Sequence, residues 1–233
     1  MSSNRDEIIT RQTIKPMEYR VKGKNLIFPK DILSNGSWIA MDENGNVSCL
    51  LNGAFVKHKK DKVYSKSRGQ VLLESLLFDS VEFFVNAVLL ENVEPFTLLI
   101  LKNNANELFF YELKWDGKNK HIKKLDNHSA QIWSSVTLYS NEIIARKNKH
   151  FEEFLLNFSN PNASEIFNFH QSNKDINDGG LLLKNEVLRT VSISQICLDN
   201  EKTIFTYQDL LLNERSEIEN TLSYSTKNQD QTL

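Results

Sequence analysis

The stretch that most constrains the fold is Gly36–Phe55, which reads GSWIAMDENGNVSCLLNGAF. Its Asn44-Gly45 pair stands between two apolar runs and predicts a two-residue hairpin turn, because Asn and Gly best tolerate the positive φ that both turn positions need. A turn at that point pairs Ile39 with Leu50. Neither strand alternates between apolar and polar residues, so the sequence predicts a hairpin buried on both faces, in the middle of a layered fold.

The composition indicates an ordinary globular protein. At 233 residues and 27.0 kDa the chain is long enough for one large domain or two small ones. Lys and Arg total 28 against 30 Asp and Glu, and the pI is near 6.2, which argues against a general nucleic-acid binder. Cys49 and Cys197 lie in apolar runs and favour two free thiols in a reducing compartment, with a disulfide as the alternative. No apolar run approaches the length of a membrane helix and no signal peptide opens the chain, so we expect a cytoplasmic protein without a membrane span.

Hydrophobic patterning predicts segregated groups of strands and helices. Strands are expected at 19–21, 25–28, 39–52, 96–102, 108–115, 121–125, 132–138, 191–198 and 203–207. Four helices are expected. Two of them cover 70–78 and 142–158, a third begins at a cap on Asp79, and a short fourth begins at Asn160-Pro161. This order predicts an α+β fold in which two stacked antiparallel sheets are covered by helices on both outer sides. Large apolar residues thin out from Asn213, so we expect one domain over 1–212 and a flexible tail over 213–233.

One basic segment and the histidines bear on ligand chemistry. The segment from 57 to 68 has a single acid, Asp61, and six basic residues: Lys57, Lys59, Lys60, Lys62, Lys66 and Arg68. It is either a solvated loop or an anion-binding rim, the latter because Ser67-Arg68-Gly69 leads into a helix whose free N–H groups attract anions. The five histidines are scattered without ligand-like spacing, so we expect neither a metal site nor a cofactor.

Several short motifs, in a specific order, resemble those of the NRDE proteins, also called the transport and Golgi organisation protein 2 family. They cover roughly residues 3 to 207 and are Asn4-Arg5-Asp6-Glu7, Gly36-Ser37-Trp38-Ile39-Ala40, Asn44-Gly45-Asn46-Val47, Leu51-Asn52, Ser67-Arg68-Gly69, Trp133-Ser134-Ser135 and Arg189-Thr190-Val191-Ser192. The family favours Thr where this chain has Ser37.

The resemblance implies a four-layer αββα fold similar to that of N-terminal-nucleophile hydrolases. In the related choloylglycine-hydrolase branch an N-terminal Cys attacks an amide, its own amine acting as base and an Asn supplying the oxyanion hole. By position, Arg5 and Asp6 would flank the nucleophile, Asn52 would be the oxyanion donor and Arg189 would close the pocket. Further expected ligand contacts are Arg68, Gly69, Trp133 and Ser134.

The position of Asn52 at the end of a strand predicts where its side chain points. Because it ends an apolar strand, we expect its side chain to point into a pocket that Arg5 or Arg189 also reaches. The alternative is that Asn52 caps the strand by bonding to nearby backbone.

The chain departs from the family at its start. Family members begin Met-Cys, followed by a hairpin whose second strand ends in the Asn-Arg-Asp-Glu motif, whereas here the motif begins at residue 4. We therefore expect the natural gene to start roughly 15 to 20 residues upstream, the length of two short strands and a turn. Ser2 is a chemically possible nucleophile, but it is adjacent in sequence to the Arg-Asp pair rather than across a hairpin from it.

The sequence and the resemblance support two candidate functions from different classes. The first is a non-catalytic binding or trafficking protein for an anionic, partly apolar small molecule, such as a haem or an acyl-containing ligand. Eukaryotic members of the family are associated with lipid and haem handling. The second is an amidase-type hydrolase acting on non-peptide C–N bonds, with its nucleophilic Cys missing from this chain.

Overall fold

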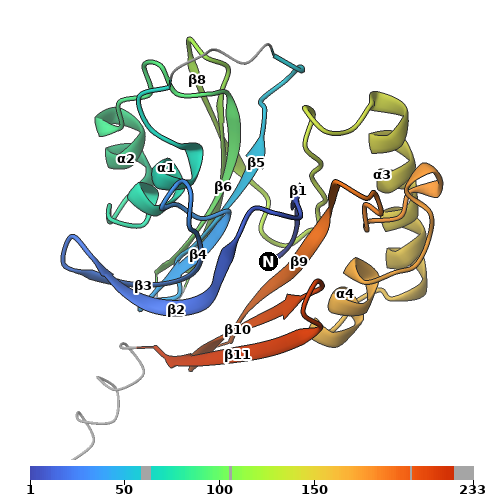
Figure 1. Cartoon of the computed structure of the whole chain (residues 1–233). Coiled ribbons are helices and arrows are strands. Elements are labelled where there is room, and N and C mark those ends of the chain that lie inside the picture. The colour runs from blue at the N-terminus through green and yellow to red at the C-terminus, as the bar shows by residue number, and fades with distance from the viewer. Residues whose placement is uncertain (59–63, 105–106, 200, 223–233) are drawn as a thin grey trace, which may run out of the picture.

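A computed structural model describes residues 1–58, 64–104, 107–199 and 201–222, and within these ranges the strands form two antiparallel sheets (Figure 1). The four-stranded sheet has the order β1 (Ser2–Ile8), β9 (Leu188–Leu198), β10 (Lys202–Asp209) and β11 (Glu214–Thr221). The seven-stranded sheet follows the chain as β2 (Thr13–Val21), β3 (Lys24–Asp31), β4 (Ile39–Asp42), β5 (Val47–Asn52), β6 (Phe96–Asn104), β7 (Glu107–Trp115) and β8 (Lys120–Leu125).

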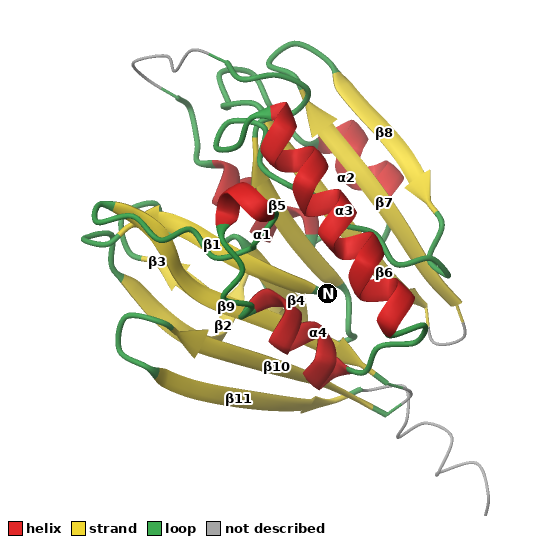
Figure 2. Ribbon diagram, turned by 90° about the vertical axis from the view of Figure 1, so that its right-hand side faces the viewer, coloured by secondary structure: helices red, strands yellow, loops and turns green. Residues whose placement is uncertain are grey.

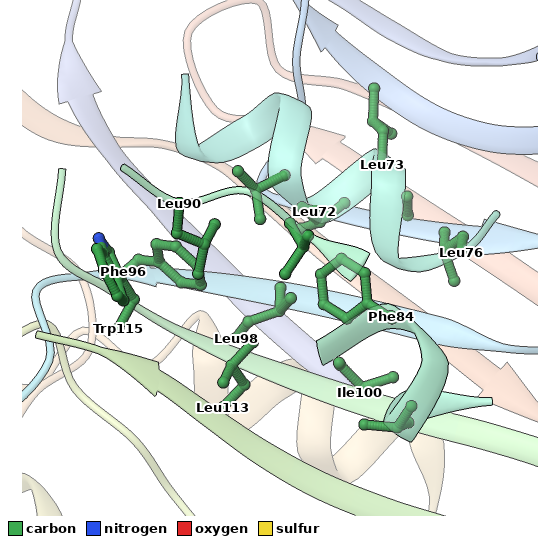
Figure 3. Close-up of a cluster of buried hydrophobic side chains, with 14 of the residues drawn as sticks. Leu72, Leu73, Leu76, Phe84, Leu90, Phe96, Leu98, Ile100, Leu113 and Trp115 are labelled. Atoms are coloured by element: carbon green, nitrogen blue, oxygen red, sulfur yellow. The ribbon is translucent and has the colours of Figure 1, made fainter. Parts of the chain in front are cut away.

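Helices cover the outer faces of both sheets. The larger sheet carries α1 (Arg68–Ser75) and α2 (Val81–Ala87), and their contact buries a cluster that includes Leu72, Phe84, Phe96, Leu98 and Leu113 (Figure 3). On the outer side of the smaller sheet, α4 (Ala163–His170) packs against β1 and β9, and α3 (Asn141–Asn157) lies beside α4 (Figure 2). A short 3-10 turn at Ile176–Asp178 contacts α3.

A second apolar cluster lies between the two sheets, where Ile39, Met41 and Leu99 of the larger sheet meet Ile196 and Phe205 of the smaller one. Burial of apolar side chains at such a contact is the main favourable term in folding. The layers are therefore helices, sheet, sheet and helices, which confirms the predicted α+β four-layer sandwich.

Local sequence signals explain where the helices begin. Ser67 caps α1, and its side chain accepts from the Gln70 N–H while Gln70 returns a bond to the Ser67 N–H. Asn162 and Glu165 make the same reciprocal arrangement at the start of α4. Each such box satisfies two backbone donors that have no partner inside the helix.

The central hairpin forms, but in a register one residue away from the predicted one. Ile39 pairs with Cys49 rather than with Leu50. The cause is Asp42, whose carboxylate accepts from the Asn46 N–H and holds a longer loop than two residues. Within this loop only Gly45 has positive φ, at +79°, so the turn is not of the predicted two-residue type.

Two other expectations about secondary structure are wrong. Residues 132–138 are irregular rather than a strand. The expected flexible tail begins instead with β11, which pairs with β10 over Glu214–Thr221. This strand is mostly polar because it lies at the edge of the sheet, so it lacks the apolar signal of a core strand. The remainder of the expected tail, 223–233, lies outside the described residues.

Both cysteines are free, Cys49 buried and Cys197 half-buried. Among the described residues, every helix is too short or too polar to cross a bilayer.

Candidate functional site

A cavity of about 1640 Å³ opens between the two sheets and continues around β1. Arg5 and Asp6 are consecutive on β1 and both line it, and successive side chains of a strand point to opposite faces. We call the side of Arg5, with Trp38, Leu99, Phe110 and Trp133, the inter-sheet lobe. The side of Asp6, with Lys147, Phe151, Phe154 and Leu155, is the helix lobe.

Arg5 is the central cation of the inter-sheet lobe. It is buried, its guanidinium donates to Asp31 and to Thr13, and its Cζ lies 4.3 Å from the centre of the Trp38 ring. An arginine stacked on an aromatic face and held by a carboxylate has a fixed orientation. Burial lowers the pKa of Arg5, while Asp31 and Glu7 act to raise it.

Asp31 joins a second arginine to this group. Arg11 Nε donates to Asp31 Oδ2 at 2.7 Å, and Arg11 Nη1 lies 3.2 Å from Glu7 Oε2. Burial would raise the pKa of Asp31, but hydrogen bonds from Arg11 and the Ser34 N–H outweigh it, so the pKa lies below its ordinary value. Arg5, Arg11, Asp31 and Glu7 therefore form one connected ion-pair network at the cavity wall.

A third arginine, Arg68, lines the cavity from the first turn of α1. Its Nη2 lies 3.2 Å from Glu94 Oε2, and Glu94 Oε1 lies 3.0 Å from His58 Nε2. Burial lowers the pKa of Arg68, and Glu94 opposes that shift. Lys57 and Lys66 also line this part of the cavity, whereas Lys59, Lys60 and Lys62 of the predicted rim lie outside the described residues.

Gly69 lines the cavity, but its neighbours give it a packing role. A Cβ at Gly69 would lie 2.8 Å from the backbone N and O of Ser37, and one at Gly36 would lie 2.6 Å from the carbonyl carbon of Gly69. The start of α1 can approach the strand that follows Gly36 only because both residues lack a side chain.

Asn52 and its surroundings occupy the end of β5. Asn52 lines the same cavity as Arg5, but it is exposed, and its backbone O accepts from the Ser135 hydroxyl at 2.9 Å. Arg189 is also exposed and is not among the residues that line the cavity in the described part of the chain. The structure thus brings Asn52 and Arg5 to one cavity and leaves Arg189 outside it.

The segment that contains Trp133 and Ser134 closes one side of the inter-sheet lobe. Trp133 Nε1 donates to Glu112 Oε2 at 2.9 Å, and its ring meets Phe110 edge to face with centroids 5.7 Å apart. Ser134 is half-buried and lines the cavity beside it. Both predicted contact residues therefore reach the cavity.

Asp6 faces the helix lobe as part of a buried polar cluster. Its carboxylate accepts from the hydroxyls of Tyr139 and Thr190. Burial raises the pKa of Asp6, and the two hydroxyls and Lys147 oppose that rise. Next to this cluster, Asn4 Nδ2 donates to the Leu181 carbonyl and Asn4 Oδ1 lies 2.9 Å from His170 Nδ1.

Sequence reasoning missed Asp31, Glu94, Tyr139 and Lys147. Each is a single residue outside any short motif, and its importance comes from a partner far away in the chain, which for Lys147 is Asp6. Among the described residues, no group of three His, Cys, Asp or Glu side chains could hold a metal ion.

Two stacked antiparallel sheets with helices on both outer sides make a four-layer sandwich of the N-terminal-nucleophile hydrolase-like fold. Solved structures with this architecture agree. The chain superposes on an arginine-to-leucine variant of conjugated bile acid hydrolase from Clostridium perfringens with a TM-score of 0.57 and 13% identity, over 94% of this chain and 88% of that one. A cysteine-to-alanine mutant of the same enzyme gives 0.55 and 12%, over 93% and 87%.

The chain belongs to the Transport and Golgi organisation 2 family, whose model matches residues 1–228. No curated protein matches the sequence. The family resemblance inferred from the short motifs is thereby confirmed.

Proposed function

We propose that this protein is a non-catalytic binding or trafficking protein for a small molecule that combines an anionic group with an apolar body, haem-like or acyl-like in character. The observation that carries the proposal is the inter-sheet lobe, where three arginines and a largely apolar wall line one cavity. The arginines would receive the acidic group, and the wall would bury the apolar body.

The arginines suit acid recognition because they are preorganised. Asp31 holds Arg5 and Arg11, and Glu94 holds Arg68. A guanidinium has five donors in a rigid fork, so one carboxylate partner leaves others for a ligand oxygen. Groups already fixed in place lose little entropy on binding.

The apolar wall suits an acyl chain or a flat hydrophobic ring. It is formed by Trp38, Leu99, Leu101, Phe110, Trp133 and Ile196. Each buried methylene of a ligand contributes about 0.8 kcal/mol. Affinity would therefore rise with the length of the apolar part.

The thiols favour binding over catalysis. Burial raises the pKa of both Cys49 and Cys197 above the ordinary value. A thiol nucleophile needs the opposite shift, since the thiolate is the reactive form.

Ligand titration tests the proposal. Binding of a long-chain fatty acid, its methyl ester and haem is measured by quenching of tryptophan fluorescence, with wild type, Arg68→Met and Arg20→Met. Arg20 is a matched control because it is an exposed arginine outside the cavity lining in the described part of the chain, and its Nη1 donates to Asn25 Oδ1 at 2.8 Å.

We expect the acid to bind at least about tenfold more tightly than the ester, and Arg68→Met to lose that preference, because a hydrogen bond to a charged group contributes about 1.5–3 kcal/mol. Arg20→Met should bind like wild type. Equal affinities for acid and ester, or equal losses in the two variants, would refute the proposal.

An amidase-type hydrolase is the second candidate, supported by the similarity in fold to conjugated bile acid hydrolase. Because residue 2 is Ser, the candidate nucleophile within this sequence is Ser2, whose Oγ accepts from Gln195 Nε2 at 3.1 Å. We expect no hydrolysis of simple N-acyl amides or conjugated bile acids that depends on Ser2. A product burst that Ser2→Ala abolishes and Cys49→Ala retains would favour the hydrolase instead.

A further inference from the structure

Lys147 is a buried lysine whose amine is not paired with an anion in the described part of the chain. It is the one buried residue of the seventeen in α3 and only 4% exposed. Lysines are almost never fully buried unless an anion pairs with them. Within the described part of the chain, however, its Nζ has neither a hydrogen-bond acceptor nor a carboxylate within 4 Å. Instead it lies 3.4 Å from the centre of the Tyr139 ring.

The titratable groups around Lys147 are Asp6 on β1, His170 on α4 and Tyr139 in the loop before α3. Asp6 on β1 contributes the nearby negative charge, and its oxygens already accept from Tyr139 and Thr190. His170 on α4 is neutral at physiological pH, because burial lowers its pKa to about 4. Burial lowers the pKa of Lys147 to about 8, although Asp6 opposes the shift. A substantial share of the amine is therefore neutral near pH 7.5.

The amine borders a space with apolar walls. Lys147 lines the helix lobe together with Phe151, Phe154, Leu155 and Phe169. Phe154 and Phe169 stack with centroids 4.6 Å apart and form an aromatic part of the same cavity lining. A small molecule with a hydrocarbon chain fits this environment, and a hydrophilic one does not.

We propose that Lys147 is a reactive amine that condenses reversibly with an aldehyde or ketone carrying an apolar chain, bound in the helix lobe. The Nζ lone pair attacks the carbonyl carbon, and the carbonyl oxygen leaves as water with the two hydrogens of the neutral amine. The product is a C=N bond to Nζ, and the step needs no oxidant or reductant. This activity goes beyond binding of the anionic ligand, which uses the arginines of the other lobe.

Trapping of the condensation product in wild-type protein tests the proposal. The full chain is incubated at pH 7.5 with octanal and cyanoborohydride, which reduces the C=N bond to a stable octylamine, and labelled lysines are identified by peptide mass spectrometry. Lys149 is the internal control, because it is an exposed lysine on the same helix.

We expect Lys147 to be labelled at least about ten times faster than Lys149. Burial lowers the pKa of Lys147 to about 8, so roughly one-quarter of this amine is neutral at pH 7.5, and the neutral form is the one that attacks a carbonyl. Octanal should also label Lys147 faster than glyceraldehyde does, because the lobe is apolar. Labelling of Lys147 no faster than Lys149, or no preference for octanal, would overturn the proposal.

Two variants test the assignment of the label to Lys147. Lys147→Arg keeps the positive charge but should lose the rapid labelling by octanal. In Lys149→Arg, Lys147 should be labelled as fast as in wild type. Rapid labelling of the Lys147→Arg variant would also refute the assignment.

Discussion

Replacing Asp31 by Asn tests how much the arginine network contributes to stability. The substitution keeps the size of the side chain but removes the charge that faces Arg5 and Arg11. Asp31 and Arg5 are both almost fully buried, with side chains 6% and 7% exposed, whereas Arg11 is 34% exposed. The variant therefore leaves the buried guanidinium of Arg5 without its hydrogen-bonded carboxylate, and the remaining carboxylate, Glu7, lies 4.0 Å away.

The two contacts of Asp31 differ in expected magnitude. Breaking a buried ion pair by removing one partner costs about 3–5 kcal/mol, because the other charge remains desolvated. The contact with Arg11 is closer to a surface pair and contributes about 0–1 kcal/mol. The loss of roughly 3–6 kcal/mol is a large part of the 5–15 kcal/mol by which a typical domain is stable.

Urea unfolding and calorimetry of Asp31→Asn measure this loss. We expect a melting temperature at least about 6 °C below that of wild type, at about 2–4 °C per kcal/mol for a chain of this size. The control is Asp79→Asn, which removes the ion pair between Asp79 and Lys24. The Asp79 side chain is 94% exposed, so this pair lies at the surface. If the two variants lose equal stability, and less than about 1 kcal/mol, the network does not stabilise the fold.

The arginine network should also make the stability of the protein depend on pH. The pKa of Asp31 is depressed in the folded protein, so its contribution is present above its unfolded pKa of about 3.9 and is lost as pH falls through the lower folded value. Acid unfolding of wild type should therefore include a component in that window that Asp31→Asn lacks.

Three further predictions concern other parts of the molecule. Gly69→Ala should lower the free energy of unfolding by about 1–3 kcal/mol in a urea titration, because its Cβ would meet Ser37 backbone atoms at 2.8 Å; an unchanged midpoint would contradict the close packing. Burial lowers the pKa of His170 to about 4, so between pH 6.5 and 4 the unfolded chain binds the extra proton and stability should fall as pH falls; a His170→Gln variant should show a flatter pH dependence over that range, and an equally steep one would argue against a buried neutral imidazole. Cys49 is buried with a raised pKa, so iodoacetamide should alkylate half-buried Cys197 first and Cys49 only on unfolding, and equal rates by mass spectrometry would contradict the buried position.

Local chemistry made much of the fold predictable from the sequence. The helix after Ser67 and the apolar runs of β6 and β9 were predicted from neighbouring residues without reference to any distant partner. The exact caps were less accurate, because α2 is capped by Ser80 rather than Asp79 and α4 by Asn162 rather than at Asn160-Pro161. The order of these elements was enough for the four-layer architecture, because segregated groups of strands and helices have few ways to bury their apolar faces. The motif that contains Arg5 and Asp6 likewise placed two residues that line the cavity.

The tertiary structure decided what depends on distant partners. The hairpin register followed the Asp42 carboxylate rather than the Asn44-Gly45 signal, and polar β11 is a strand because β10 supplies its backbone hydrogen bonds. The helix lobe is the clearest case, since Asp6 meets Tyr139 across 133 positions and Thr190 across 184. No window of sequence contains such a pair. A lysine such as Lys147, which looks like a solvated residue of α3, becomes a buried amine only when the sheet and the helix pack together.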